Sequence, residues 1–287
     1  MSINHEGWFI ETYEGLSAFG LKYSKKLYET QSPYQKIEIF DTEAMGKILI
    51  LDGCFMVTEK DTFIYHEMLI HPAMAQLKSP KKTLVIGGGD GGSVTELVKY
   101  PQLESITLCE IDEMVTRSCQ KFFPEVSRGL DDPRSTSAFE DGAAYVARHK
   151  DHFDGIFVDS TDPVGPGKAL YQVSFYNDIK DSLREGGLAV FQTESPIFMP
   201  KVFSETVNKL KTVFGSANVL PYLAVIPSYP GALWSFTMCS KAPDRLTICD
   251  SNLTQDTLKG LKYFNHKTHK AAFCLPQFVE ELVRHND

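Results

Sequence analysis

The chain has 287 residues, of which 43% are hydrophobic and 23% charged; this suits one large domain or two unequal ones and excludes a disordered protein. Its formal net charge of −8 argues against nucleic acid as the main partner and is compatible with a cationic ligand, although many proteins are acidic only for solubility. No apolar run approaches the roughly 18 residues that span a membrane, and six cysteines without a C-x-x-C pair predict reduced thiols in a cytoplasmic protein with no membrane partner.

The first third of the chain is predicted to form β-structure. Residues 34–40 alternate apolar and polar side chains, which places Ile37 and Ile39 on one face of a strand. Two further strand-like runs flank Asp52-Gly53, a dipeptide typical of two-residue hairpin turns.

A helix is predicted to close this part of the chain, over residues 61–77. Asp61 can cap its N-terminus, because aspartate is favoured at that position. The segment SPKK, which begins at Ser79, ends this unit, and we expect a domain boundary near Ser79-Pro80. The candidates for its buried face are Phe63, Met68 and Leu69.

From residue 82 onward, short apolar strands alternate with helices. Strands are expected at residues 82–89, 104–112, 153–159 and 186–194, and helices at residues 93–101 and 113–123. This alternation predicts a parallel sheet with helices on both faces. We therefore expect an α/β fold, a Rossmann-like, methyltransferase-type doubly wound sheet (residues 80–287), preceded by a small N-terminal β-domain of strands, hairpin and final helix (residues 1–79).

A glycine-rich loop follows the first of these strands. Gly87, Gly89 and Gly92 fit the G-x-G-x-x-G pattern, which usually indicates a nucleotide whose phosphates lie at a helix N-terminus. Asp90, inside the loop, is either a turn residue or a ligand-binding acid. Because a carboxylate would repel a pyrophosphate, we favour an adenosyl ligand that lacks phosphate and has a positively charged tail.

Acidic or amide side chains follow nearly every predicted strand of the α/β domain. They are Asp90, Glu110, Asp112, Asp141, Asp159, Asp162, Gln192 and Glu194. In this architecture ligands bind at the carboxyl ends of the strands, so these side chains should surround one cleft. Glu110 stands where a ribose-binding acid is expected, a position shared by dinucleotide and adenosylmethionine sites. Individually, Asp141, Asp159 and Asp162 could instead be loop or helix-capping residues.

A metal is the less favoured explanation for these acids. His266 and His269 form an H-x-x-H pattern, but they occur late in the chain and nothing places them near the acids. Repelling carboxylates around one cleft require a cation, and an organic cation meets that need without a metal.

Several stretches together resemble the spermidine synthase family of polyamine aminopropyltransferases. The most specific are GGGDGG, which begins at Gly87, and DSTDPVGP, which runs from Asp159 to Pro166. GWF, YQKIEIF, CEID, IPSYPGALWSF and HKAAFCLP also fit, in order and over nearly the whole chain.

The resemblance implies roles for particular residues. Asp159 is the catalytic acid–base residue, and Tyr65 orients the amine. Asp90 binds the aminopropyl amine. The residues expected to contact the polyamine are His66, Asp90, Asp159, Ser160, Thr161, Asp162, Gln192 and Tyr229. The residues expected around the methylthioadenosine part are Gln35, Gly87, Gly89, Glu110, Asp141, Gly142 and Pro166.

The implied reaction is spermidine synthesis. An amine of putrescine displaces methylthioadenosine from the aminopropyl group of decarboxylated S-adenosylmethionine, which is a cosubstrate, with no resident cofactor or metal. Cadaverine or spermidine as the acceptor, a putrescine N-methyltransferase and a catalytically silent polyamine-binding protein remain alternatives. The family also implies a homodimer, or a tetramer. Residues 162–171 are either a lid over the reacting groups or an ordinary stiff loop.

Overall fold

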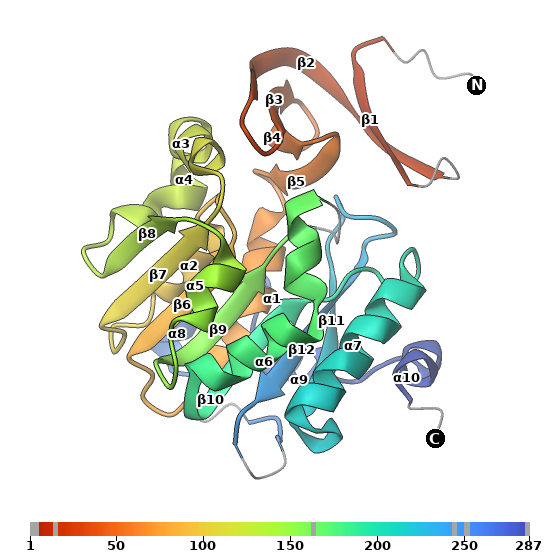
Figure 1. The fold of residues 1–287 in the computed structure, drawn as a ribbon. Helices are drawn as coiled ribbons and strands as arrows, with labels where there is room; N and C mark the ends of the chain where they lie inside the picture. Colours follow the sequence, from red (N-terminus) through yellow and green to blue (C-terminus); the bar gives the residue numbers. More distant parts are fainter. Residues whose placement is uncertain (1–5, 14–16, 162–164, 243–245, 250–252, 285–287) are drawn as a thin grey trace.

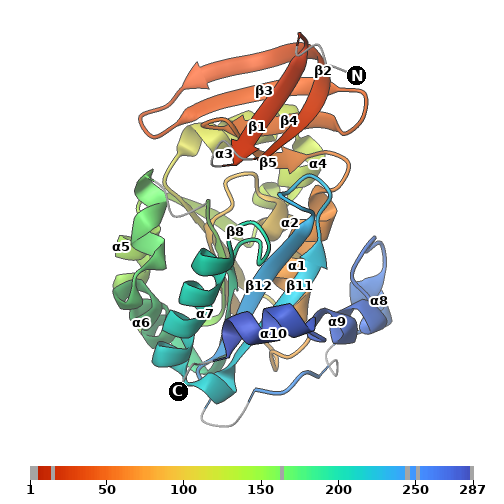
Figure 2. The same ribbon diagram turned by 90° about the vertical axis from the view of Figure 1, so that its right-hand side faces the viewer.

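The computed structural model describes residues 6–13, 17–161, 165–242, 246–249 and 253–284. Its N-terminal part is a five-stranded antiparallel sheet in which sequence neighbours pair (Figure 1). The strands are β1 (Trp8–Tyr13), β2 (Ser17–Gln31), β3 (Lys36–Thr42), β4 (Gly46–Leu51) and β5 (Cys54–Thr58). This small sheet lies beyond one end of a larger α/β unit (Figure 2).

The local predictions for the small sheet are confirmed. Asp52 and Gly53 join β4 to β5 with φ of 47° and 91°, the left-handed backbone that a two-residue hairpin needs. Ile37 and Ile39 are fully buried and share an apolar cluster with residues of helix α3 (Glu113–Phe122), among them Val115. The small sheet is therefore packed against the α/β unit through one of its faces.

A seven-stranded sheet forms the centre of the larger unit. Its order is β11-β12-β10-β9-β6-β7-β8, and the five strands from β10 to β8 are parallel. The chain runs outward from β6 through β7 to β8 and then returns to place β9 on the other side of β6. The strands are β6 (Lys82–Gly87), β7 (Ser105–Glu110), β8 (Ser135–Phe139), β9 (Phe153–Asp159), β10 (Leu183–Gln192), β11 (Val219–Val225) and β12 (Leu233–Ser240). The strand order thus reverses between β6 and β9, which is where such sheets bind ligands.

Helices cover both faces of this sheet (Figures 1 and 2). One apolar cluster includes residues of α1 (Thr62–Met74), α2 (Gly92–Leu97), α8 (Gln255–Leu258) and α9 (His266–Ala272). The other includes residues of α5 (Gly142–Ala147), α6 (Val173–Ser182), α7 (Pro200–Phe214) and α10 (Gln277–Val283). The short segments are α4 (Pro124–Ser127), η1 (Arg128–Asp131), η2 (Gly165–Tyr171) and η3 (Ser216–Asn218). The predicted Rossmann-like α/β class is confirmed.

Three details differ from the sequence-based expectation. Asp61 precedes α1 but makes no capping bond; its carboxylate accepts from the Thr58 hydroxyl (2.5 Å) and from the Ser228 backbone N–H (2.8 Å). Phe63 is only half-buried, whereas Met68 and Leu69 are buried as expected. Strands β11 and β12, which continue the sheet in antiparallel fashion, were not predicted.

The domain boundary at residues 79 and 80 stays a prediction. Helix α1 was placed in the N-terminal unit, yet its buried residues belong to the apolar cluster of the seven-stranded sheet. It is buried almost all round, which explains why no single apolar face stands out in its sequence.

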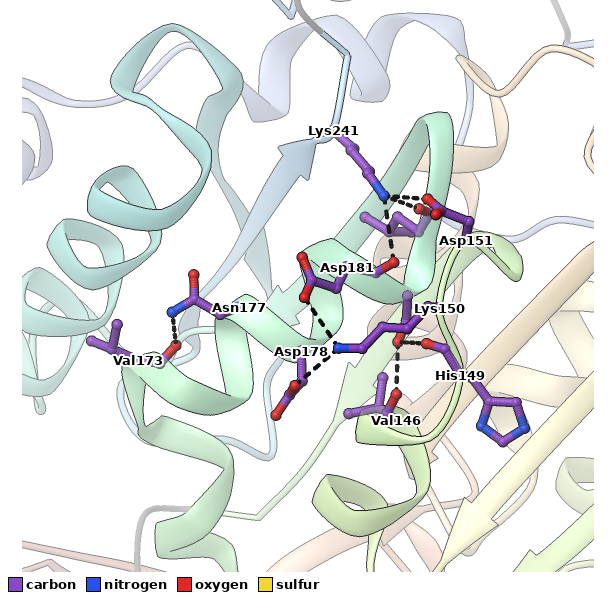
Figure 3. A network of polar contacts seen from close by, with 11 residues as sticks. Val146, His149, Lys150, Asp151, Val173, Asn177, Asp178, Asp181 and Lys241 are labelled. Carbon is purple, nitrogen blue, oxygen red and sulfur yellow. Dashed lines mark hydrogen bonds and ion pairs between the residues drawn. The ribbon is translucent and has the colours of Figure 1, made fainter.

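A network of lysines and acids lies near the amino ends of the parallel strands, at the opposite edge of the sheet from the cavity-forming carboxyl ends (Figure 3). Lys150 lies 3.2 Å from Asp178 and 3.1 Å from Asp181, both on α6. Lys241, just after β12, lies 2.6 Å from Asp151 and donates to the backbone oxygen of Leu183. Because most of these side chains, Lys241 excepted, are at least one-third exposed, the network contributes modestly to stability.

Candidate active site

A cavity of about 550 Å³ lies between the small sheet and the carboxyl ends of the parallel strands. Asp112, which was expected at this cleft, is not among the residues that line the cavity, but all the described residues expected to contact the polyamine or the methylthioadenosine part do line it. They are Gln35, Tyr65, His66, Gly87, Gly89, Asp90, Glu110, Asp141, Gly142, Asp159, Ser160, Thr161, Gln192 and Tyr229. Asp162 lies outside the described residues, as does the side chain of Pro166. His266 and His269, on α9, are not among the lining residues.

The glycine loop lets the end of β6 touch the acids of its neighbouring strands. A Cβ on Gly87 would lie 2.2 Å from the backbone oxygen of Asp159, and one on Gly88 would lie 2.6 Å from Asp159 Oδ2. A Cβ on Gly89 would lie 3.0 Å from Glu110 Oε2. Gly87 and Gly88 also have φ of 77° and 65°, which glycine adopts without strain.

Asp159 ends β9 and pairs in register with Gly87 of β6, at the point where the strand order reverses. Its carboxylate is buried, and Oδ2 accepts a hydrogen bond of 2.7 Å from the Ser93 hydroxyl. Burial, together with the nearby charge of Asp90, raises the pKa of Asp159, while His66 opposes that rise. The phenol of Tyr65 also interacts with this carboxylate, and burial raises the pKa of Tyr65 so that it stays a neutral donor.

His66 lies between the two acids. Its Nε2 is 3.1 Å from Asp90 Oδ1, an ion-pair contact rather than an aligned hydrogen bond, and its Nδ1 is 4.0 Å from Asp159 Oδ2. Burial disfavours protonation of the ring, but the carboxylates of Asp90 and Asp159 outweigh it and raise the pKa of His66 to about 9. The ring is therefore an imidazolium at neutral pH. A Cβ on Gly92 would lie 2.2 Å from Nε2, so that glycine makes room for the ring.

Asp90 is both a turn residue and a site acid. Its Oδ1 accepts from the backbone N–H of Gly92, two residues further on (2.7 Å), as expected of aspartate in a turn. The same side chain lines the cavity and faces His66. One atom each of His66, Asp90 and Asp159 lie within 4.8 Å of one another, so the protonated ring is the positive charge between the two carboxylates.

A second group of acids lies at the end of β7. Glu110 is buried, accepts from the backbone N–H of Asp112 (2.8 Å), and has a pKa that burial raises to about 7. Asp112 caps α3 and also accepts from the side chains of Gln35 (3.0 Å) and Ser32 (2.6 Å), which belong to the small sheet's connections. Asp112 therefore holds Gln35 beside the cavity. The capping interpretation of Asp141 also applies, because its Oδ1 accepts from the Ala143 N–H (2.7 Å) at the start of α5.

Comparison with known protein families shows to which family this chain belongs. Residues 62–250, most of the chain, match the family model described as spermine/spermidine synthase domain. The chain belongs to the spermidine synthase family. Residues 7–59 match a second model, the spermidine synthase tetramerisation domain.

Curated and solved members of the spermidine synthase family cover nearly all of this chain. A polyamine aminopropyltransferase of Thermoanaerobacter sp. strain X514 is 43% identical over 96% of this chain and 98% of its own, and that of Moorella thermoacetica is 40% identical over 96% of each. A crystal structure of spermidine synthase in complex with the transition state analogue AdoDATO is 38% identical, with a TM-score of 0.92 over 96% of this chain and 94% of that one. The spermidine synthase from Thermotoga maritima superposes with a TM-score of 0.90, at 38% identity over the same shares of the two chains.

The side of the cavity that Tyr229 and Gln192 line is held by long-range contacts. The Tyr229 hydroxyl donates to the backbone oxygen of Met56 (3.0 Å), and the Tyr229 ring contacts those of Tyr65 and Trp234. Gln192 donates from Nε2 to the Tyr171 hydroxyl (2.7 Å) and to the backbone oxygen of Ser160 (3.1 Å). Gln192 thus connects the residue that follows β9 to the last residue of η2.

The residues at the site that were missed from the sequence include Glu11, Gly88 and Ser93. Glu11 of β1 lines the cavity and accepts from the backbone N–H of Phe55 (2.9 Å). Gly88 falls on a variable position of the glycine pattern, and Ser93 is an ordinary residue of a short helix. Glu194, which was named as a strand-end acid, is buried with φ of 68°, a strained conformation of the kind found at functional sites.

Within the described residues, no helix is long and apolar enough to cross a membrane.

Proposed function

We propose that this protein is a spermidine synthase that transfers the aminopropyl group of decarboxylated S-adenosylmethionine to putrescine, giving spermidine and methylthioadenosine. The observation that carries the proposal is the charge of the cavity. Seven carboxylate residues line it, and none of the described lining residues is lysine or arginine. They are Glu11, Asp52, Asp90, Glu110, Asp141, Asp159 and Glu194. Such a lining attracts cations and repels phosphates.

The chemistry is a direct displacement. The lone pair of a putrescine amine attacks the propyl carbon beside the sulfonium, and the carbon–sulfur bond breaks with its electron pair on sulfur, which becomes a neutral thioether. Holding nitrogen, carbon and sulfur in line can lower the barrier by about 7–11 kcal/mol. The attacking nitrogen loses a proton in the process.

Asp159 is the proposed acceptor of that proton. An alkyl amine has a pKa near that of lysine, about 10, so only about one molecule in a thousand is neutral at pH 7. An ordinary aspartate is a poor base for such an amine, but the raised pKa of Asp159 makes it a better one. Tyr65, whose phenol stays protonated, orients the amine through a hydrogen bond.

The other residues are proposed to place the two cations. Asp90 pairs with the ammonium of the aminopropyl group and disfavours ordinary adenosylmethionine, whose extra carboxylate would lie nearby. The nucleoside is held by Glu110 on the ribose diol, Gln35, Asp141, Gly142 and the backbone of Gly87 and Gly89. His66, Ser160, Thr161, Gln192 and Tyr229 line the polyamine side. The predicted roles of Asp162 and Pro166 stay predictions.

The assembly and location are proposed as well. A homo-oligomer, either a dimer or a tetramer, is supported by the match of residues 7–59 to a tetramerisation domain. A cytoplasmic location is supported by the six cysteines, none of which is paired in a disulfide. Decarboxylated S-adenosylmethionine enters as a cosubstrate, and no resident cofactor is needed for the displacement.

A product assay with Asp159→Asn tests the function. We expect turnover to fall by a factor of roughly 10²–10⁴, the usual contribution of a general base, with unchanged folding. Asp178→Asn, which alters an aspartate in the distant network of Figure 3, is the matched control and should keep full activity. Wild-type protein that forms no spermidine from putrescine, or methylates it, would contradict the proposed reaction; near-normal turnover of Asp159→Asn would contradict the proposed base. Offering cadaverine and spermidine in the same assay identifies the preferred acceptor.

A further inference from the structure

Four polar groups form a continuous chain through the site. The hydroxyl of Ser93, a fully buried residue in the first turn of α2, donates to Asp159 Oδ2 at 2.7 Å. On its other side, the same hydroxyl lies 3.3 Å from His66 Nδ1. His66 Nε2 in turn lies 3.1 Å from Asp90 Oδ1. The order of contacts is therefore Asp159, Ser93, His66, Asp90.

The number of protons on these groups fixes the direction of the chain. A serine hydroxyl has one proton, so it can donate to only one of its two neighbours. An imidazolium donates from both ring nitrogens. With His66 in that form, Nδ1–H donates to the Ser93 oxygen, and the hydroxyl proton must point to Asp159. A neutral ring with its proton on Nε2 would instead offer Nδ1 as an acceptor and compete with Asp159 for the Ser93 proton.

We propose that Ser93 is a positioning residue for the reaction: its hydroxyl, oriented by protonated His66, holds Asp159 Oδ2 and leaves Oδ1 to receive the proton of the amine. The role of Oδ1 rests on the proposed function, whereas the orientation of the hydroxyl does not. Because the Ser93 side chain has no exposed surface, bulk water does not compete with Asp159 for its hydroxyl proton.

The hydrogen bond from Ser93 also affects when Asp159 is ionised. A donor to the carboxylate favours its charged form, so loss of that donor should raise the pKa of Asp159. The other groups that face Asp159 are Tyr65 and His66 from α1 and Asp90 from the loop after β6. Glu194, after β10, lines the same cavity. Ser93→Ala also removes the hydrogen-bond acceptor of His66 Nδ1, so the comparison with Ser93→Thr, which keeps a hydroxyl for both neighbours, is what assigns the change to the hydroxyl.

The test compares Ser93→Ala with Ser93→Thr, which keeps a hydroxyl, and with Thr95→Val. Thr95 is a matched control on the same helix, because its hydroxyl bonds to the backbone of Val126 and Gly129 and not to the acids. The turnover of each variant is measured against pH. The titration of Asp159 is followed in parallel by NMR on carboxyl-labelled aspartate, with Asp159→Asn used to assign the signal.

For Ser93→Ala we expect about a tenfold loss of turnover and an acid limb of the pH profile moved upward by about one pH unit, with the Asp159 titration moving equally. Ser93→Thr should restore both, and Thr95→Val should change thermal stability alone. An Asp159 titration in Ser93→Ala that coincides with wild type overturns the inference, as does an Asp159 titration moved as far in Ser93→Thr as in Ser93→Ala. The NMR titration needs no substrate, so it distinguishes this failure from failure of the proposed reaction, which the wild-type product assay reports.

Discussion

Gly88→Ala should inactivate the protein by moving one carboxylate. A Cβ at this position would lie 2.6 Å from Asp159 Oδ2, 3.1 Å from its Cγ and 3.2 Å from its Cβ, whereas ordinary contact begins at 3.4 Å. The backbone on both sides is fixed, because Gly88 N–H donates to the Asp159 backbone oxygen at 2.8 Å. The carboxylate must therefore retreat by about 0.8 Å, the difference between 2.6 and 3.4 Å. Oδ2 is the oxygen that Ser93 holds, so the retreat also weakens that hydrogen bond.

The substitution has two separable effects. Gly88 has φ of 65°, so any alanine there is strained by about 1–2 kcal/mol whatever surrounds it. The displaced carboxylate affects the reaction, since a misplacement of about 1 Å can reduce the rate about a hundredfold. Gly186 separates the two effects: its φ is 75°, but a Cβ there meets nothing within 4 Å. Gly186→Ala should therefore lose stability and keep activity.

The assay measures spermidine formation and thermal unfolding for both variants. We expect similar losses of stability, about 2–4 °C in melting temperature for each kcal/mol, and a hundredfold difference in turnover. If Gly88→Ala turned over within about threefold of Gly186→Ala, then the close approach of Gly88 to Asp159 would have no catalytic meaning and the reasoning would be refuted.

Two further predictions concern the other acids. Asp90→Asn keeps an oxygen for the Gly92 N–H but loses its charge. Its affinity for decarboxylated S-adenosylmethionine should therefore fall by about ten- to a hundredfold, while its affinity for methylthioadenosine changes little. Calorimetry that finds equal weakening of both would contradict the role of Asp90. Burial raises the pKa of Glu110 from 4.5 to about 7, so its contribution to stability is present below 4.5 and is lost as the pH rises through 7. Raising the pH from about 5 to 8 should therefore lower the free energy of unfolding of wild type by about 2.5 kcal/mol more than that of Glu110→Gln. Equal pH dependence of the two proteins in denaturant unfolding would argue against a buried Glu110 that ionises near pH 7.

The parts of the fold that the sequence predicted are those decided by neighbouring residues. The Asp52-Gly53 turn and the glycine loop depend on backbone freedom at single positions, which residue type reveals. The gathering of Glu110 and Asp159 also followed from local information, because each ends a parallel strand and all such ends share one edge. Alternation of strands and helices was therefore sufficient to locate the cavity before any contact was known.

The parts that were missed depend on contacts between distant residues. Asp61 has the residue type of a helix cap, but its carboxylate is taken by Ser228, 167 positions away. Ser93 became a site residue only through Asp159, 66 positions away. Strand β11 contains Pro221, which argues against a central strand, and it is tolerated because β11 is an edge strand bonded only to β12. Residue type alone contains none of this pairing information.

The charge arrangement around His66 explains how an acidic cavity can be stable when empty and still attract a cation. Asp90 and Asp159 face one another across the ring, and two ionised carboxylates so close would repel strongly in a buried site. One imidazolium compensates one of them and leaves a net negative charge, so that burial and the charge of Asp90 together still raise the pKa of Asp159. Binding of an ammonium would supply the missing positive charge. A neutral side chain at position 66 should therefore destabilise the empty protein at neutral pH, but much less once decarboxylated S-adenosylmethionine is bound, so that the cosubstrate raises the melting temperature of His66→Gln more than that of wild type.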